Sequence, residues 1–170
     1  MRLFLQDESR FGLHERGTRR RLSACGTKPH QEILPRYASF WLYAAVEPTT
    51  GASLLLEMPA LDGACVQAFL DAFSHTYPES LNVLVWDGAP AHIAKALQVP
   101  GNVLLVRLPP YSPELNPVER LWQHLRQKMG SVLPADLGAL KDTLAEQICR
   151  STPAMLASLC GYDYLLNLAP

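Results

Sequence analysis

The spacing of apolar and polar residues along the chain predicts a mixed β-sheet covered by helices. A short apolar run over 2–6 predicts a strand that ends at the polar residues Asp-Glu-Ser. Two apolar runs, over 39–48 and 52–58, flank Thr-Thr-Gly and predict a β-hairpin. Over 61–77, apolar residues recur at the three- and four-residue intervals of an amphipathic helix that packs on a sheet.

The second half of the pattern predicts parallel strands. The almost continuously apolar run over 81–86 follows a crossover helix and suits a strand buried on both faces. A short helix over 91–98 and a second buried strand over 102–108 are expected next. Further helices are predicted over 136–150 and from Pro153. Between the strand over 102–108 and the helix over 136–150, one helical face is marked by Val118, Leu121, Trp122, Leu125 and Met129. The order of elements predicts an α/β fold whose sheet combines an antiparallel hairpin with parallel strands.

Length and composition favour one globular domain over 1–170. Hydrophobic residues make up 48% of the chain, and no apolar run approaches the roughly 20 residues of a membrane span. Acidic residues follow the start too closely for a signal peptide, so we expect a cytoplasmic protein that does not contact a membrane. Widely separated cysteines are expected to be thiols rather than disulfides, namely Cys25, Cys65, Cys149 and Cys160.

The distribution of charge matters more than its sum. A net charge of −1 argues against a generic nucleic-acid binder. The segment 10–36 nevertheless carries seven basic residues against Glu15 and Glu32. This local excess could face phosphates, and it could equally be a solvated loop. The basic residues are Arg10, Arg16, Arg19, Arg20, Arg21, Lys28 and Arg36.

Three carboxylates occupy positions where such a layout places functional groups. Asp7 is expected at the end of the first strand and Asp87 at the carboxyl end of a central parallel strand, where open α/β sheets bind ligands. Glu119 opens the helix after the last strand. If the first two strands are neighbours, the three side chains can meet at one sheet edge. Carboxylate oxygens are the usual ligands of Mg²⁺ or Mn²⁺, and a pair of such ions catalyses phosphodiester displacement.

Each of these residues also has a purely structural interpretation. An Asp at the end of a strand is commonly a turn residue or a helix N-cap. Asn116-Pro117-Val118-Glu119 is close to a capping box, with Asn at the N-cap, Pro in the first position and Glu in the third. Position alone therefore leaves both interpretations open.

Longer motifs favour the catalytic interpretation. Residues 86–92 read WDGAPAH, and residues 108–122 read LPPYSPELNPVERLW. Together with QDESR at 6–10, they closely resemble the DDE transposases of the IS630 group, relatives of the Tc1/mariner elements. The resemblance covers residues 1 to about 130. Many relatives have Asn directly after the second Asp, where this chain has Gly88.

The resemblance implies an RNase H-like fold with Asp7, Asp87 and Glu119 as catalytic residues and metal ligands. It implies cut-and-paste transposition, in which the element is cleaved at its terminal inverted repeats and its strands are transferred into target DNA. Two Mg²⁺ or Mn²⁺ ions are expected to assist both steps. Family members usually carry an N-terminal helix-turn-helix region, which this chain lacks. We therefore expect an upstream reading frame to supply DNA binding, homo-oligomers assembled on DNA, and a location at the bacterial nucleoid.

Several neighbouring residues are weaker candidates. Basic side chains that could hold DNA phosphates are Arg19, Arg20, Arg21, Lys28, His92, Arg120 and Arg126. Glu8 and Glu114 are adjacent to the predicted ligands but are disfavoured as ligands, since Glu8 points away from Asp7 if the strand continues. Trp122 lies on the apolar stripe and is expected to pack in the core.

Two other functions remain compatible with the sequence. The first is an RNase H-like nuclease without strand transfer, against which the long proline-rich motif argues. The second is an inactive transposase remnant, which the retention of all three carboxylates disfavours. No Walker-type loop or Gly-x-Ser-x-Gly elbow is present, so P-loop nucleotide hydrolysis and serine-hydrolase chemistry are excluded.

Overall fold

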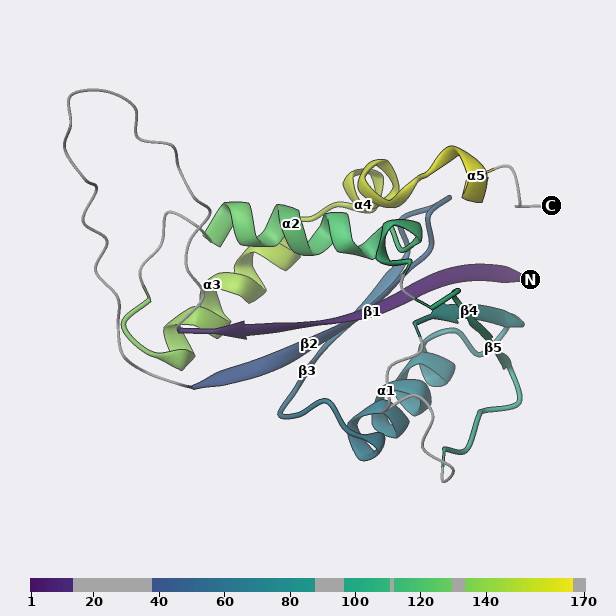
Figure 1. Cartoon of the computed structure of the whole chain (residues 1–170), viewed down its shortest axis with the longest axis horizontal. Coiled ribbons are helices and arrows are strands. Elements are labelled where there is room, and N and C mark those ends of the chain that lie inside the picture. Colours follow the sequence, from purple (N-terminus) through teal and green to yellow (C-terminus); the bar gives the residue numbers. More distant parts are fainter. Residues whose placement is uncertain (14–37, 88–96, 111, 130–133, 167–170) are drawn as a thin grey trace.

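A five-stranded sheet forms the centre of the protein (Figure 1). The structure, a computed structural model, describes residues 1–13, 38–87, 97–110, 112–129 and 134–166. The sheet order is β3-β2-β1-β4-β5. β1, β2 and β3 pair antiparallel, whereas β4 pairs parallel with β1 and β5 parallel with β4, so the predicted mixed sheet is confirmed. The strands are β1 (Arg2–Gly12), β2 (Ser39–Val46), β3 (Ser53–Met58), β4 (Asn82–Trp86) and β5 (Val103–Arg107).

Helices cover both faces of the sheet (Figure 1). α1 (Gly63–Thr76) packs on one face. The opposite face is covered by α2 (Val118–Met129), α3 (Leu137–Cys149) and α4 (Pro153–Cys160), and the short α5 (Asp163–Leu166) follows. Within the described ranges, no helix is long and apolar enough to cross a membrane.

β1 separates two hydrophobic cores because its side chains alternate between the two faces. Phe4 is fully buried with α1 residues such as Phe73, and their rings meet edge to face at 4.9 Å. Leu5 and Phe11 are buried on the other face with Trp122 of α2. The central strand therefore contributes to both cores, and residues at odd positions of β1 face α2.

The amphipathic helices form as the sequence predicts. In α1 the buried stripe includes the expected residues Val66, Phe69, Leu70 and Phe73, together with Cys65. The α1 N-cap is Asp62, whose carboxylate accepts a 2.9 Å hydrogen bond from the Cys65 amide and satisfies an otherwise unpaired N–H. The predicted helices over 136–150 and from Pro153 are confirmed as α3 and α4. Three cysteines are thiols as expected, namely Cys65, Cys149 and Cys160.

The first strand is longer than predicted. It continues past Gln6 to Gly12, and its second half pairs with β2 from Asp7 opposite Ala44 onward. The prediction that the strand stops at Asp-Glu-Ser, and that Asp7 lies at its end, is therefore wrong. Polar residues in this strand are tolerated because α2 supplies hydrogen-bond partners for two of them.

The last strand was expected to be buried, but β5 lies at the edge of the sheet. Leu104 and Val106 are 52% and 41% exposed, since no described helix covers their side of this strand. The helix expected over 91–98 falls mostly outside the described residues. Leu97 and Gln98 lie within them and are not helical.

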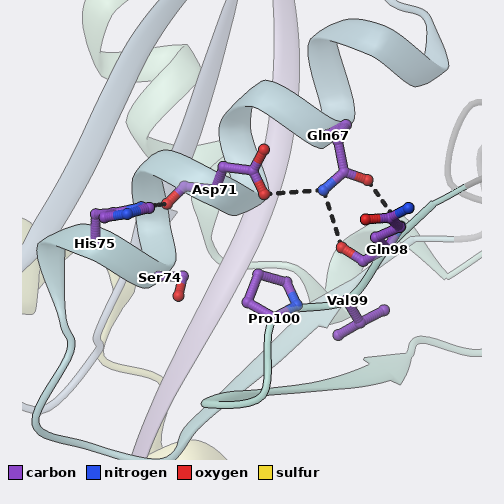
Figure 2. Close-up of a pocket in the computed structure, with 7 residues that line it drawn as sticks. All are labelled: Gln67, Asp71, Ser74, His75, Gln98, Val99 and Pro100. Atoms are coloured by element: carbon purple, nitrogen blue, oxygen red, sulfur yellow. Dashed lines mark hydrogen bonds between the residues drawn. The ribbon is translucent and has the colours of Figure 1, made fainter.

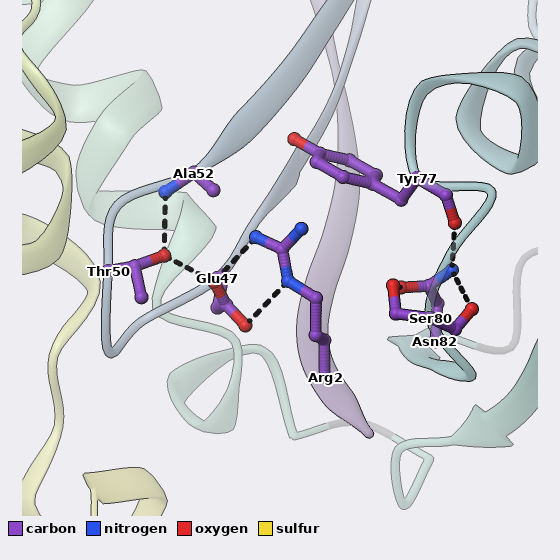
Figure 3. A network of polar contacts seen from close by, with 7 residues as sticks. All are labelled: Arg2, Glu47, Thr50, Ala52, Tyr77, Ser80 and Asn82. Carbon is purple, nitrogen blue, oxygen red and sulfur yellow. Dashed lines mark hydrogen bonds and ion pairs between the residues drawn. The ribbon is translucent and has the colours of Figure 1, made fainter.

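An ion pair fixes the beginning of β1 (Figure 3). The Arg2 guanidinium donates to both carboxylate oxygens of Glu47, at 3.1 and 2.7 Å, and lies 4.5 Å from the centre of the Tyr77 ring. Asn82, which is fully buried, donates to the carbonyls of Tyr77 and Ser80. These contacts join the beginning of β1, the hairpin and the end of α1.

The hairpin turn provides a test of this fold. Gly51 has a φ of +73° and lies so close to α4 that an added Cβ would be 1.8 Å from the Pro153 carbonyl oxygen. Gly51→Ala should therefore lower the free energy of unfolding by at least about 1–3 kcal/mol from the backbone strain alone. Gly101 has open space around it, so Gly101→Ala should change this free energy by less than about 1 kcal/mol. Urea unfolding measures both, and equal effects would contradict the packing of the hairpin on α4.

Candidate active site

Asp7 lies in the middle of β1, on the face that α2 covers. Its side chain is only 9% exposed, which is unusual for a carboxylate. The carboxylate oxygen Oδ2 accepts a 2.7 Å hydrogen bond from the indole Nε1 of Trp122. A buried carboxylate requires such donors, because its charge is separated from water. Asp7 is thus held by the helix that carries Glu119.

Among the described residues, the neighbouring side chains of Asp7 add negative charge to this buried carboxylate. Burial, together with the negative charges of Glu119 and Glu8, raises the pKa of Asp7 from 3.8 to about 7. The Trp122 hydrogen bond opposes this shift without cancelling it. Glu119 is therefore near enough to Asp7 for their charges to repel, and a cation between them would relieve both.

Asp87 directly follows β4, the strand beside β1. The two strands pair in parallel up to Leu5 opposite Val85, so Asp7 and Asp87 each come two residues after the last paired residue of adjacent strands. Leu5 and Val85 both pack into the α2-side core. Asp87 is exposed to solvent, whereas Asp7 is buried.

Glu119 lies in the first turn of α2, and its position depends on the residue that caps this helix. Asn116 is 3% exposed, and its Oδ1 accepts a hydrogen bond from the Val118 amide at 3.2 Å. Its Nδ2 donates to the Gln6 carbonyl of β1 at 2.8 Å. The predicted Asn cap is confirmed, and it also attaches the start of the helix to the strand beside Asp7.

Three side chains of α2 and its cap hold the helix in register on β1. Besides Asn116 and Trp122, Arg126 donates from Nη2 to the Ser9 hydroxyl at 2.6 Å. These residues and Glu119 are spaced at three- or four-residue intervals, which places them on one face of the helix. Glu119 therefore faces the same strand as the three anchoring residues.

The C-terminal helices support the start of α2 from the other side. The Tyr164 hydroxyl donates to the Leu115 carbonyl, and the Cys160 thiol donates to the Pro117 carbonyl at 3.6 Å. The Arg120 guanidinium lies 4.4 Å from the centre of the Tyr162 ring. Burial raises the pKa of the Cys160 thiol to about 12, so it stays protonated and acts as a donor.

The donor set of this site fits a hard divalent cation. Asp7, Asp87 and Glu119 offer only carboxylate oxygens, which Mg²⁺ and Mn²⁺ prefer, and the negative charges of Glu119 and Glu8 contribute to the raised pKa of Asp7. In the part of the chain that the structure describes, however, no three His, Cys, Asp or Glu side chains converge closely enough to hold an ion. A metal site formed by all three carboxylates stays a prediction.

Some of the other candidate residues lie within the described part of the chain and the rest lie outside it. Arg120 and Arg126 contact Tyr162 and Ser9, and contact of either arginine with DNA remains untested. Glu8 accepts from Gln6 Nε2 at 2.8 Å, and its even position on the continued strand confirms that it points away from Asp7. Glu114 is exposed in the 3-10 helix Pro113–Leu115. Outside the described residues lie Arg19, Arg20, Arg21, Lys28 and His92.

Sequence reasoning missed the role of the Trp122 side chain. Trp122 is 1% exposed and packs in the core as expected, but its N–H also binds Asp7. A usable signal was present, because a buried indole N–H nearly always finds an acceptor and Trp122 is one helical turn after Glu119. Ser9, the partner of Arg126, carried no comparable signal.

A polar hollow elsewhere is unrelated to this site (Figure 2). It measures about 510 Å³ and lies between α1 and residues 98–100. Gln67 donates to the Gln98 carbonyl at 2.9 Å and accepts from the Gln98 amide at 2.8 Å, so these groups satisfy one another. α1 packs on the face of the sheet opposite to Asp7. We assign the hollow to the attachment of this loop.

Comparison with known proteins supports the fold. The chain overlays on the Mos1 transposase paired-end complex with left transposon end, with a TM-score of 0.69 and 17% identity over 94% of this chain and 51% of that one. For the Mos1 mariner paired-end complex with Mn, the TM-score is 0.70 and the identity 18%, over 93% and 51% of the two chains. The sheet and its flanking helices have the RNase H-like fold of the Mos1 catalytic domain.

Sequence comparison adds a relative and a family. An uncharacterized protein of Sinorhizobium fredii, y4pE/y4sA, is 38% identical over 87 residues, which cover 51% of this chain and 64% of that protein. The chain thus spans less than two thirds of that relative and about half of each Mos1 chain. The family described as DDE superfamily endonuclease matches residues 2–141, which include Asp7, Asp87 and Glu119. Because this match covers most of the sequence, the chain belongs to the DDE superfamily endonucleases.

Proposed function

We propose that the chain, over 1–170, is the catalytic domain of a bacterial DNA transposase of the IS630 group within the Tc1/mariner type. Its activity is metal-dependent DNA cleavage and strand transfer, as in cut-and-paste transposition. The observation that carries the proposal is the hydrogen bond between the buried Asp7 and Trp122 of α2, the helix that carries Glu119, with Asp87 directly after the neighbouring strand β4. Membership of the DDE superfamily endonucleases supports it.

In the proposed mechanism Asp7, Asp87 and Glu119 hold two Mg²⁺ or Mn²⁺ ions. Bound there, the ions would activate an attacking water or 3′-hydroxyl and neutralise charge on the leaving oxygen. The protein contributes a fixed geometry: β1 and β4 place the two aspartates, and α2 places Glu119. Mos1 mariner paired-end complexes are described with Mn and with Mg, which supports this choice of ion.

The proposed partners are the terminal inverted repeats of the element and its target DNA. Mos1 structures are described as paired-end and strand transfer complexes, and a similar assembly of several copies on DNA is proposed here. Each Mos1 chain is about twice as long as the part that this chain covers. We propose that an upstream reading frame supplies the DNA-binding region and that the protein acts at the bacterial nucleoid.

Removing one carboxylate tests the catalytic assignment. Asp87→Asn and Glu119→Gln should reduce Mn²⁺-dependent nicking of terminal-repeat DNA to background, because each change removes a metal ligand while nearly preserving shape. Glu114→Gln, five residues before Glu119 and exposed, should nick like the parent. The assay uses the chain fused to its proposed DNA-binding region. It measures both nicked DNA and the DNA products of strand transfer.

Different outcomes of this assay distinguish the alternatives. Nicking without joined products would indicate a nuclease that lacks strand transfer. Failure of the parent to nick would favour an inactive remnant. Equal nicking by the parent and Asp87→Asn would contradict the assignment of the three carboxylates.

The pH dependence of stability tests the environment of Asp7. In the metal-free protein the folded state holds the Asp7 proton more tightly than the unfolded chain, since its pKa is raised to about 7. The stability that this group contributes is full below about pH 4 and falls as the pH rises to about 7, by at most about 1.4 kcal/mol per pH unit. The free energy of unfolding of Asp7→Asn should lack this dependence on pH. Unfolding in urea with a chelator measures it, and parallel pH curves for parent and variant would argue against a raised pKa.

The basic segment 10–36 is proposed to bind phosphates. Replacing Arg19, Arg20 and Arg21 with Ala should flatten the dependence of DNA affinity on salt by up to about one unit of log–log slope per lost contact. Arg150→Ala, at the exposed end of α3, is the control and should leave the slope unchanged. Fluorescence anisotropy over a range of salt concentrations measures the slope. An unchanged slope in the triple variant would assign these arginines to solvent.

A further inference from the structure

We propose that Trp122 is a positioning residue for Asp7: its indole N–H holds Oδ2, so that the remaining lone pairs of the carboxylate are directed to the cation shared with Asp87 and Glu119. The inference rests on the proposed function, because it concerns the same metal site. It assigns to Trp122 a task that is separate from filling the core.

The contact between the two side chains is short and buried. Nε1 and Oδ2 are 2.7 Å apart, Trp122 is 1% exposed and Asp7 is 9% exposed. Hydrogen bonds to a charged acceptor are stronger than neutral ones, and a low dielectric strengthens them further. An indole has one N–H and no acceptor, so Trp122 can only donate. The bond therefore restricts the rotation of the Asp7 carboxylate.

The indole itself is held rigidly. Trp122 packs in the α2-side core, where its ring meets Phe11 edge to face with centroids 6.3 Å apart. The cap of α2 and Arg126 bind β1 on either side of it along the helix. A donor fixed by packing can orient its acceptor, whereas a mobile donor would follow it.

One turn of α2 carries both the donor and a proposed ligand. Glu119 and Trp122 are three residues apart and face the same strand. The hydrogen bond to Asp7 thus fixes the separation between Asp7 and Glu119 through a rigid helical turn. Partners of metal ligands act in this manner in many metal sites, and their removal typically weakens metal affinity by about 10–100-fold.

Core packing alone makes a different prediction. If Trp122 only fills space, its N–H is dispensable and any side chain of the same shape should serve. β-(3-Benzothienyl)alanine at position 122 separates the two roles, because sulfur replaces the N–H while the bicyclic shape is retained. Trp122→Phe is a second variant that removes the N–H with natural chemistry. Trp41→Phe, in β2 and packed against the α1-side core, is the matched control for loss of an indole.

The first measurement is Mg²⁺ affinity by calorimetry on the full chain at mildly alkaline pH. The benzothienyl variant and Trp122→Phe should bind Mg²⁺ about 10–100-fold more weakly than the parent, and Trp41→Phe should bind like the parent. Far-ultraviolet circular dichroism verifies folding of each variant. Parent-like affinity in the folded benzothienyl variant would overturn the inference.

A second measurement is independent of affinity and of catalysis. With ¹⁵N-labelled tryptophan, the indole resonance of Trp122 should move on addition of Mg²⁺, while that of Trp41 should not. An unmoved Trp122 resonance at saturating Mg²⁺ would also overturn the inference.

Failure of this inference and failure of the proposed function give different results. If the parent binds Mg²⁺, Asp87→Asn does not, and the benzothienyl variant binds like the parent, only the role of Trp122 is wrong. If the parent and Asp87→Asn both fail to bind Mg²⁺, the metal site itself is wrong and the inference falls with it.

Discussion

The buried hydrogen bond from Trp122 to Asp7 joins the central strand to the helix that carries Glu119. Asp7 is a buried carboxylate in a strand that contributes to two cores, and it is tolerated because α2 provides a donor. The same contact sets where α2 lies along β1. The position of Glu119 relative to Asp7 thus depends on the same hydrogen bond that satisfies the buried carboxylate in β1.

The two faces of the sheet have different tasks. The α1 face is an aromatic core closed by the Arg2–Glu47 pair at one edge. The α2 face combines a core with a carboxylate whose pKa is raised to about 7. Uncompensated negative charge costs stability, and functional sites often carry such a cost. The α1 face and the helices behind α2 provide the stability that allows it.

The helices and the hairpin could be predicted from the sequence because their signals are local. The stripe of α1 and the Asn116 cap of α2 are read from residues within a few positions of each other. The length of β1 could not be predicted in this manner, because the partners of Asp7 and Ser9 lie more than 100 residues away in α2. Burial of β5 depends on its neighbours in the sheet rather than on its own composition, so an apolar run gave the wrong expectation.

The candidate site was partly predictable for a related reason. Motifs single out the three carboxylates as candidates, and the structure binds Asp7 to the helix that carries Glu119 and places β4 beside β1. The role of the Trp122 N–H was missed because the periodic pattern describes its ring and not its polar atom. A side chain with both apolar and polar parts can serve the core and the site together.

The proposed metal site requires the carboxylates of Asp7 on β1, Asp87 after β4 and Glu119 on α2 to bind one cluster of ions. Anomalous diffraction from crystals grown with Mn²⁺ tests it most directly. We expect Mn²⁺ coordinated by Asp7, Asp87 and Glu119, with the Trp122 indole still bound to Oδ2 of Asp7. Mn²⁺ bound elsewhere on the protein, with these three carboxylates uncoordinated, would contradict it.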